Sequence, residues 1–219
     1  MNHKGTSASI VNAAEVLFAE QGFTETTVRQ ITSSAKVNLA AINYHFGSKK
    51  GLIQAVAEKT LTPLCAELED MLAQRGSVSD AGQITLDELL EMLMRAFLVV
   101  HSNNVNALAV FMRLLELSYM QNQGELREFI MSRYGEKLHP FIHLTRQDSA
   151  PMEDDEFFWR LHFLLGSITF TLSNFHTLRA LEKKTYQSGA EVEKILHRMI
   201  PVLSAGLQAR SDKTFFCRL

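Results

Sequence analysis

Residues 27–52 read TVRQITSSAKVNLAAINYHFGSKKGL. Thr27 followed by Gln30 fits a capping box, which predicts a short helix that ends near residue 35. Asn38 is suited to cap a second short helix that runs through His45. The tight turn between them begins at Lys36. This spacing is typical of a helix-turn-helix, in which the second helix enters the major groove of DNA.

The second helix has small side chains in its first turn, and these would let the backbone approach base edges closely. Asn43 is the best candidate for reading a base, because its amide can form two hydrogen bonds with adenine. Thr27, Tyr44 and His45 carry polar groups suited to phosphate oxygens, which fix the register of a protein on DNA without reading its sequence. Ile42 is expected to face inward and to anchor the helix.

Lys49 and Lys50 lie in the first turn of the next helix, which Ser48 is expected to cap. The helix dipole disfavours cations at that end. A phosphate at the same helix start would accept hydrogen bonds from free backbone N–H groups and from both ammonium groups. The alternative is a pair of solvated lysines on a loop. Beside a helix-turn-helix, the phosphate contact is the favoured interpretation.

The composition indicates a folded protein of one or two domains. The chain has 219 residues, of which 46% are hydrophobic and 21% charged, with a net charge of −2. Disordered chains have lower apolar content and higher net charge. The two cysteines, Cys65 and Cys217, form neither a disulfide framework nor a CxxC motif, which favours a reducing, cytoplasmic location. The longest uncharged stretch, 161–178, is too short and too polar to span a membrane, so no membrane partner is expected.

Helical periodicity runs through nearly the whole chain, and no strand alternation persists. This predicts an all-α protein, with a helix-turn-helix DNA-binding domain of three helices over residues 1–50 and a helical ligand-binding and dimerisation domain over residues 51–219. The first helix carries an apolar stripe and ends near Gly22. A long helix is expected over 48–74 with a bend at Pro63, and a polar loop over 76–83. Later helices are expected over 85–101, 105–121, 124–146, 153–180 and 188–209.

Three stretches identify a resemblance: AAEVLFAEQGF, TTVRQITSSAKV and INYHFGSKKGLI. Together they resemble the DNA-binding domain of TetR-type transcriptional regulators. The resemblance implies phosphate contacts by Thr27, Tyr44, His45 and Lys49, and base contacts by Ala40, Ala41 and Asn43. Leu39, Ala40 and Asn43 differ from residues common in that family, so the operator sequence is not inferred. The predicted DNA-binding residues are Thr27, Asn38, Ala40, Ala41, Asn43, Tyr44, His45, Lys49 and Lys50.

The same resemblance implies a homodimer paired through the last two long helices, 153–180 and 188–209. The residues agree with this, because helix 153–180 is apolar on nearly every side. Such a helix must be buried all round. Packing against its own core on one side and a second copy on the other is the simplest account. The alternative is a central helix wrapped entirely by its own subunit.

The body of the chain is rich in Met and Phe, which suit a site for a flexible apolar ligand. Plain core packing is the alternative for each of these positions. Arg113 is a candidate partner for an acyl carboxylate or thioester, or for Glu116 on the same helix face. The predicted ligand-binding residues are Met92, Phe97, Phe111, Met112, Arg113, Met120, Phe129 and His162.

The stretches FMRLLELSYMQNQGELR and FFWRLHFLLGS, together with NLAAINYHFGSKKGLIQAV, are similar to the fatty-acid-responsive, PsrA-like members of the family. That similarity implies a repressor of fatty-acid metabolism genes, which a fatty acid or acyl-CoA releases from a double-stranded operator. A helical lipid carrier without DNA binding, and an activator of the same fold, are the alternatives. His139 and His143 have metal-pair spacing, but no third ligand accompanies them. Neither an enzyme nor a cofactor is expected.

Overall fold

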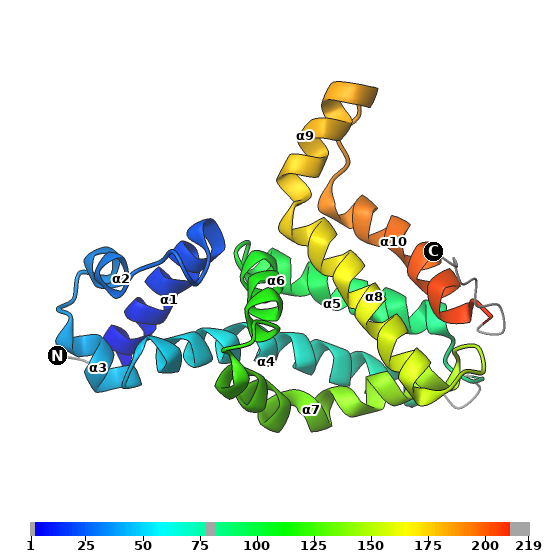
Figure 1. Cartoon of the computed structure of the whole chain (residues 1–219), viewed down its shortest axis with the longest axis horizontal. Coiled ribbons are helices and arrows are strands. Elements are labelled where there is room, and N and C mark those ends of the chain that lie inside the picture. The colour runs from blue at the N-terminus through cyan, green and yellow to red at the C-terminus, as the bar shows by residue number, and fades with distance from the viewer. Residues whose placement is uncertain (1–2, 78–81, 211–219) are drawn as a thin grey trace, which may run out of the picture. The chain divides into compact units, whose positions relative to one another are not determined.

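The computed structural model describes residues 3–77 and 82–210, and within this part of the chain every regular element is a helix (Figure 1). The helices are α1 (His3–Gln21), α2 (Val28–Ala35), α3 (Ala40–Phe46), α4 (Lys49–Gly76), α5 (Leu86–Asn103), α6 (Ala107–Ser118), α7 (Gly124–Gln147), α8 (Asp154–Ser173), α9 (Phe175–Tyr186) and α10 (Val192–Gln208). The predicted all-α class is confirmed. Four residues of the predicted loop 76–83, and Cys217, lie outside the described residues.

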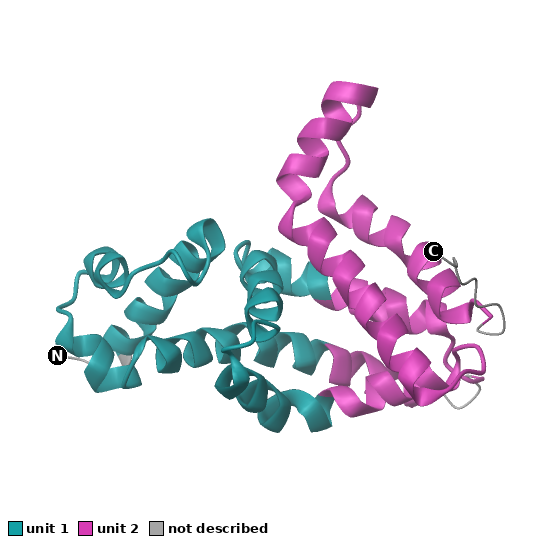
Figure 2. Ribbon diagram, viewed as in Figure 1, with its two compact units in different colours: residues 1–67, 97–137 teal, residues 68–96, 138–219 magenta. Residues whose placement is uncertain are grey.

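The chain divides into two compact units (Figure 2). The first comprises residues 1–67 and 97–137, and the second comprises residues 68–96 and 138–219. The long helices α4, α5 and α7 each contribute one segment to each unit.

In the first unit, α1 to α3 and the start of α4 share one apolar core. Ile10, Phe18, Ile31, Ile42 and Leu52 are each at most 1% exposed. Burying a side chain of this size stabilises the fold by about 1.5–3 kcal/mol. Ile42 is the inward anchor of α3, as its position in the sequence predicts.

The helix ends follow the local signals in the sequence. Thr27 and Gln30 form both hydrogen bonds of a capping box at the start of α2. Asn38 accepts a 3.0 Å hydrogen bond from the Ala41 N–H at the start of α3, and Ser48 accepts one of 3.2 Å from the Gly51 N–H in α4. Gly22 has a φ of +86° directly after α1, a conformation that costs glycine little.

The rest of the first unit joins α4 to α5, α6 and α7. Tyr134 of α7 is 1% exposed, and its hydroxyl lies 3.0 Å from that of Thr62, beside the proline inside α4. The rings of Phe97 and Phe111 lie 5.7 Å apart between α5 and α6.

In the second unit, the predicted helix 153–180 is wrong in one respect, because the chain breaks at Asn174 into α8 and α9. The Asn174 side chain donates a 2.9 Å hydrogen bond to the carbonyl oxygen of Phe170. Asparagine competes in this way with the backbone, and the preceding Thr171 and Ser173 are poor helix formers too. The apolar periodicity continues past this point and hides the break.

Candidate nucleic-acid interface

Helix α3 presents one polar face to solvent. Asn43 is exposed and Tyr44 is 73% exposed, whereas Ile42 between Ala41 and Asn43 is buried. Ala40 is exposed and Ala41 half-buried, so these two positions carry only methyl groups, while the N-cap residue Leu39 is 51% exposed. A short helix that is anchored by one buried side chain and has two alanines in its first turn has the form needed to enter a major groove.

The turn before α3 is fixed by the backbone. Lys36 has a φ of 55°, and the N–H groups of Lys36 and Val37 donate to the carbonyl oxygens of Ser33 and Thr32. The Asn38 amide oxygen accepts the hydrogen bond from the Ala41 N–H at the start of α3, so it already has a structural partner in this protein.

Polar groups at the edges of α2 and α3 remain accessible. The hydroxyl of Thr27 lies 2.7 Å from Oε1 of Gln30 and is exposed at the start of α2. The rings of Tyr44 and His45 meet edge to face, 5.0 Å apart. Tyr44 and His45 directly follow Asn43 on α3, where Tyr44 is exposed and His45 half-buried, so the candidate base-reading and phosphate-binding groups are adjacent along this helix.

The two lysines at the start of α4 have different environments. The Lys49 ammonium donates a 2.6 Å hydrogen bond to the carbonyl oxygen of Phe23, and burial lowers its pKa while Glu25 acts in the opposite direction. Lys50 forms a 2.9 Å ion pair with Glu125 of α7, and both side chains are more than half exposed. Exposed pairs of this kind contribute little, so Lys50 is the lysine that a phosphate would recruit at lower cost.

Family comparisons agree with this geometry along most of the chain. Residues 10–56 match the model of bacterial regulatory proteins of the tetR family, and residues 91–206 match that of the tetracyclin repressor-like C-terminal domain. The chain belongs to the TetR family.

Individual relatives of this TetR-family protein are distant. It is 30% identical over 98 residues to the probable HTH-type transcriptional regulator YttP of Bacillus subtilis, covering 45% of each chain. It is 35% identical over 92 residues to the HTH-type transcriptional repressor Rv3405c of Mycobacterium tuberculosis, covering 42% of this chain and 46% of that one. The chain thus spans about half the length of the curated relatives it matches.

Among solved structures, the fatty acid degradation regulator FadR of Bacillus halodurans aligns with a TM-score of 0.57. The alignment covers 93% of this chain and 97% of that one, at 16% identity. At this identity the likeness shows the fold alone.

The structure places five of the eight predicted ligand-binding residues of this TetR-family chain on α5, α6 and α7 of the first unit. Phe97, Phe111 and Met112 are buried, and Phe129 is half-buried. Arg113 reaches the end of α1, where a Cβ on Gly22 would lie 2.9 Å from its Nη1. Glu116, its alternative partner, is exposed. A sixth, Met120, is 49% exposed beyond the end of α6.

The remaining two predicted ligand-binding residues lie in the second unit. Met92 lines a hollow of about 380 Å³ between α4 and α5, together with Met71, Gln74, Arg75, Glu88, Glu91 and Arg95. Charged side chains form much of that wall. His162 of α8 bonds through Nδ1 to the carbonyl oxygen of Phe158, one turn earlier, and its ring contacts that of Phe158.

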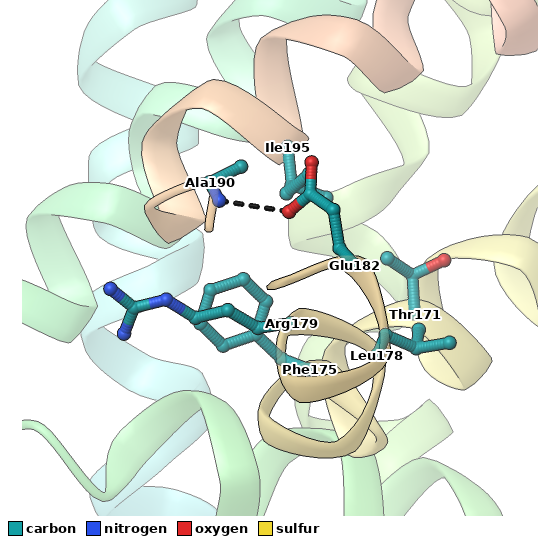
Figure 3. A pocket seen from close by; sticks show the side chains of 7 residues that line it. All are labelled: Thr171, Phe175, Leu178, Arg179, Glu182, Ala190 and Ile195. Carbon is teal, nitrogen blue, oxygen red and sulfur yellow. Dashed lines mark hydrogen bonds between the residues drawn. The ribbon is translucent and has the colours of Figure 1, made fainter. Parts of the chain in front are cut away.

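Sequence reasoning missed a smaller cavity of about 140 Å³ in the second unit (Figure 3). Its walls are Thr171 from α8, four residues of α9, Ala190 and Ile195. Glu182 accepts a hydrogen bond from the Ala190 N–H, which lowers the pKa of that carboxyl group. Arg179 pairs with Glu191. Since the helix break at Asn174 creates this cavity, no periodic signal could have located it.

Two structural features are absent from residues 3–77 and 82–210. No helix there is long and apolar enough to cross a membrane. No three His, Cys, Asp or Glu side chains gather there to hold a metal ion, and the rings of His139 and His143 stack 6.0 Å apart.

Proposed function

We propose that this chain is a homodimeric repressor that an apolar acyl ligand releases from its operator. Residues 1–50 would contact DNA, and residues 51–219 would bind the ligand and the second copy. The observation that carries the DNA contact is α3, with Asn43 and Tyr44 exposed on a helix that the buried Ile42 holds in place. Asn43 would read one base, while Tyr44, His45, Thr27 and Lys50 would contact phosphates.

A row of outward-facing aromatic side chains on α8 supports the dimer. Phe158, Trp159, Phe163 and Phe170 are each more than half exposed, although α8 is buried on its other side through Phe157 and Ile168. Soluble monomers rarely expose a row of this size.

The same face of α8 is self-complementary. Gly166 lies on α8 between the aromatic residues, and a Cβ there would meet no atom within 4 Å. In an antiparallel pairing about a two-fold axis near residues 164–165, Trp159 would face Phe170 of the second copy and Phe163 would face its Gly166. An isologous interface requires this kind of match within a single surface.

The apolar composition of α5 and α6 supports an acyl ligand. Phe97, Phe111 and Met112 form a buried cluster there, and a polarizable, unbranched side chain such as Met repacks readily around a flexible chain. FadR of Bacillus halodurans, whose fold this chain shares, is a fatty acid degradation regulator.

A DNA-release assay tests the proposal. An operator is selected from a random duplex pool with the wild-type protein, and its complex is titrated with palmitoyl-CoA, oleate and free coenzyme A. We expect palmitoyl-CoA or oleate to release the DNA and to raise the thermal midpoint of the protein, because a ligand that prefers one conformation shifts the population towards it. If neither compound does either, the acyl ligand is wrong while DNA binding stands.

Light scattering of Phe163→Glu tests the dimer. The charge would face the second copy and should yield monomers. Val105→Glu is the matched control, because Val105 is 71% exposed in the loop between α5 and α6, and it should leave the dimer intact. A Phe163→Glu protein that stays dimeric rules out this interface.

A further inference from the structure

One acidic side chain in the first unit is buried and ion-paired. Glu15 of α1 is 3% exposed. Its Oε2 pairs with the ammonium of Lys59 on α4, and its Oε1 accepts a 2.5 Å hydrogen bond from the side-chain amide of Asn104. Both carboxylate oxygens thus have charged or polar partners, as a buried carboxylate requires.

The partners of Glu15 are themselves held in place. The Lys59 ammonium also donates a 2.6 Å hydrogen bond to the side-chain oxygen of Asn12, one turn before Glu15 on α1. Asn104 accepts a 3.1 Å hydrogen bond from the Asn106 N–H, which fixes the loop between α5 and α6. Four side chains therefore form one connected network across α1, α4 and this loop.

The energy of such a network depends strongly on the relative positions of its side chains. A buried ion pair gains little net stability over apolar packing, since desolvation offsets the attraction of the charges. Its energy rises steeply when one partner moves, however, because the carboxylate then remains buried and unpaired. The network therefore resists displacement of α1 relative to α4 and to the loop before α6.

The same helix is fixed at its C-terminal end. The Arg113 guanidinium of α6 lies against Gly22, and the Lys49 ammonium of α4 bonds to the Phe23 carbonyl oxygen. Cations are favoured at the negative end of a helix. Since α1 packs against α2, and Ile10 and Phe18 of α1 and Ile42 of α3 are all buried in this unit, fixing α1 limits how far α3 can move.

We propose that Glu15, with Lys59 and Asn104, is a positioning residue for DNA recognition, which holds α1 so that α3 meets the bases in one orientation. The site rests on the family-level DNA binding and needs neither the acyl ligand nor the dimer. Loosening it should impair base reading more than phosphate binding, because base contacts demand closer placement than phosphate contacts do.

The experiment compares Glu15→Gln, Lys59→Gln and the double variant with wild type. The dissociation constant is measured by fluorescence anisotropy for the selected operator and for a scrambled duplex of equal length, and the ratio gives the specificity. We expect each single variant to lose roughly tenfold in specificity and the double variant to lose no more, because the two side chains act as one unit. Glu20→Gln, on the exposed face of α1, is the control and should keep the wild-type ratio.

The two single variants separate positioning from simple charge effects. Removing the negative charge of Glu15 should tighten binding to a polyanion, and removing the positive charge of Lys59 should weaken it, on both duplexes alike. A positioning role instead lowers the specificity in both. If Glu15→Gln fails to fold, Asn104→Ala keeps both charges and should lower the specificity as well. Specificity within twofold of wild type in Lys59→Gln and Asn104→Ala overturns the proposal.

Discussion

The ammonium of Lys49 donates a hydrogen bond to the carbonyl oxygen of Phe23 over 2.6 Å, across 26 positions of sequence. The bond joins the start of α4 to the turn between α1 and α2. The sequence predicts a phosphate contact for Lys49, and that role remains a prediction. In the structure this lysine donates to a partly buried backbone carbonyl group, whereas Lys50 forms an exposed ion pair with Glu125.

Replacing the two lysines should therefore give different results. Lys49→Met should lower the free energy of unfolding by about 1 kcal/mol, because it leaves the Phe23 carbonyl group without its donor. Lys50→Met should stay within about 0.5 kcal/mol of wild type, since its pair with Glu125 is exposed. Chemical denaturation of both variants provides the measurement. Equal losses in the two variants would show that the Lys49 hydrogen bond does not add to the free energy of unfolding.

The contact between Gly22 and Arg113 makes a second prediction. Gly22→Ala introduces a methyl group at a φ of +86° and within 2.9 Å of the Arg113 Nη1, whereas Gly47→Ala, at a φ of +71°, meets no atom within 4 Å. We expect a loss of about 1 kcal/mol from backbone strain in both variants, with only a small excess in Gly22→Ala, because the flexible Arg113 side chain can move aside. Adding Arg113→Ala to Gly22→Ala should remove the excess. Urea denaturation of all three variants measures it, and an excess that survives the double substitution argues against the contact.

Sequence reasoning succeeded where the signal is local. The caps at Thr27, Asn38 and Ser48 each depend on side chains within three residues, so spacing alone predicts them. The same reasoning did not predict the helix break at Asn174, because the residues on both sides of it continue an apolar stripe. A side chain that competes for the helix's own carbonyl groups leaves no mark on periodicity.

Local sequence patterns could not predict hydrogen-bond partners that lie far apart in the chain. Glu15 meets Asn104 across 89 positions and Lys59 across 44. On the sequence it is one acidic residue beside an apolar stripe, which is the ordinary pattern of a solvent-exposed helix flank. Only the packing of α1 against its neighbours shows that this flank is covered.

Glu88 links stability to pH in the second unit. Hydrogen bonds from Arg75, and then from the Thr85 N–H, lower the pKa of its carboxyl group. Because the pKa is lower in the folded state, the stabilisation is complete above the unfolded pKa of about 4.3 and is lost as the pH falls through the folded value. The thermal midpoints of wild type and Glu88→Gln should differ by a constant amount above about pH 5.5 and converge in acid. A difference that persists below the folded pKa contradicts this assignment.

Asn43 and Asn38 should separate base reading from the folding of α3. Asn43→Ala removes an exposed amide that makes no contribution to the α3 cap, so it should cost about 1–3 kcal/mol of binding at a single operator position and leave stability unchanged. Asn38→Ala removes the bond to the Ala41 N–H, so it should cost about 1 kcal/mol of stability and weaken binding to every duplex alike. Anisotropy titrations on the selected operator and on its single-base variants distinguish the two. If Asn43→Ala weakens all duplexes equally, α3 does not read a base through this residue, and the base contact must be sought among its neighbours on the same exposed face.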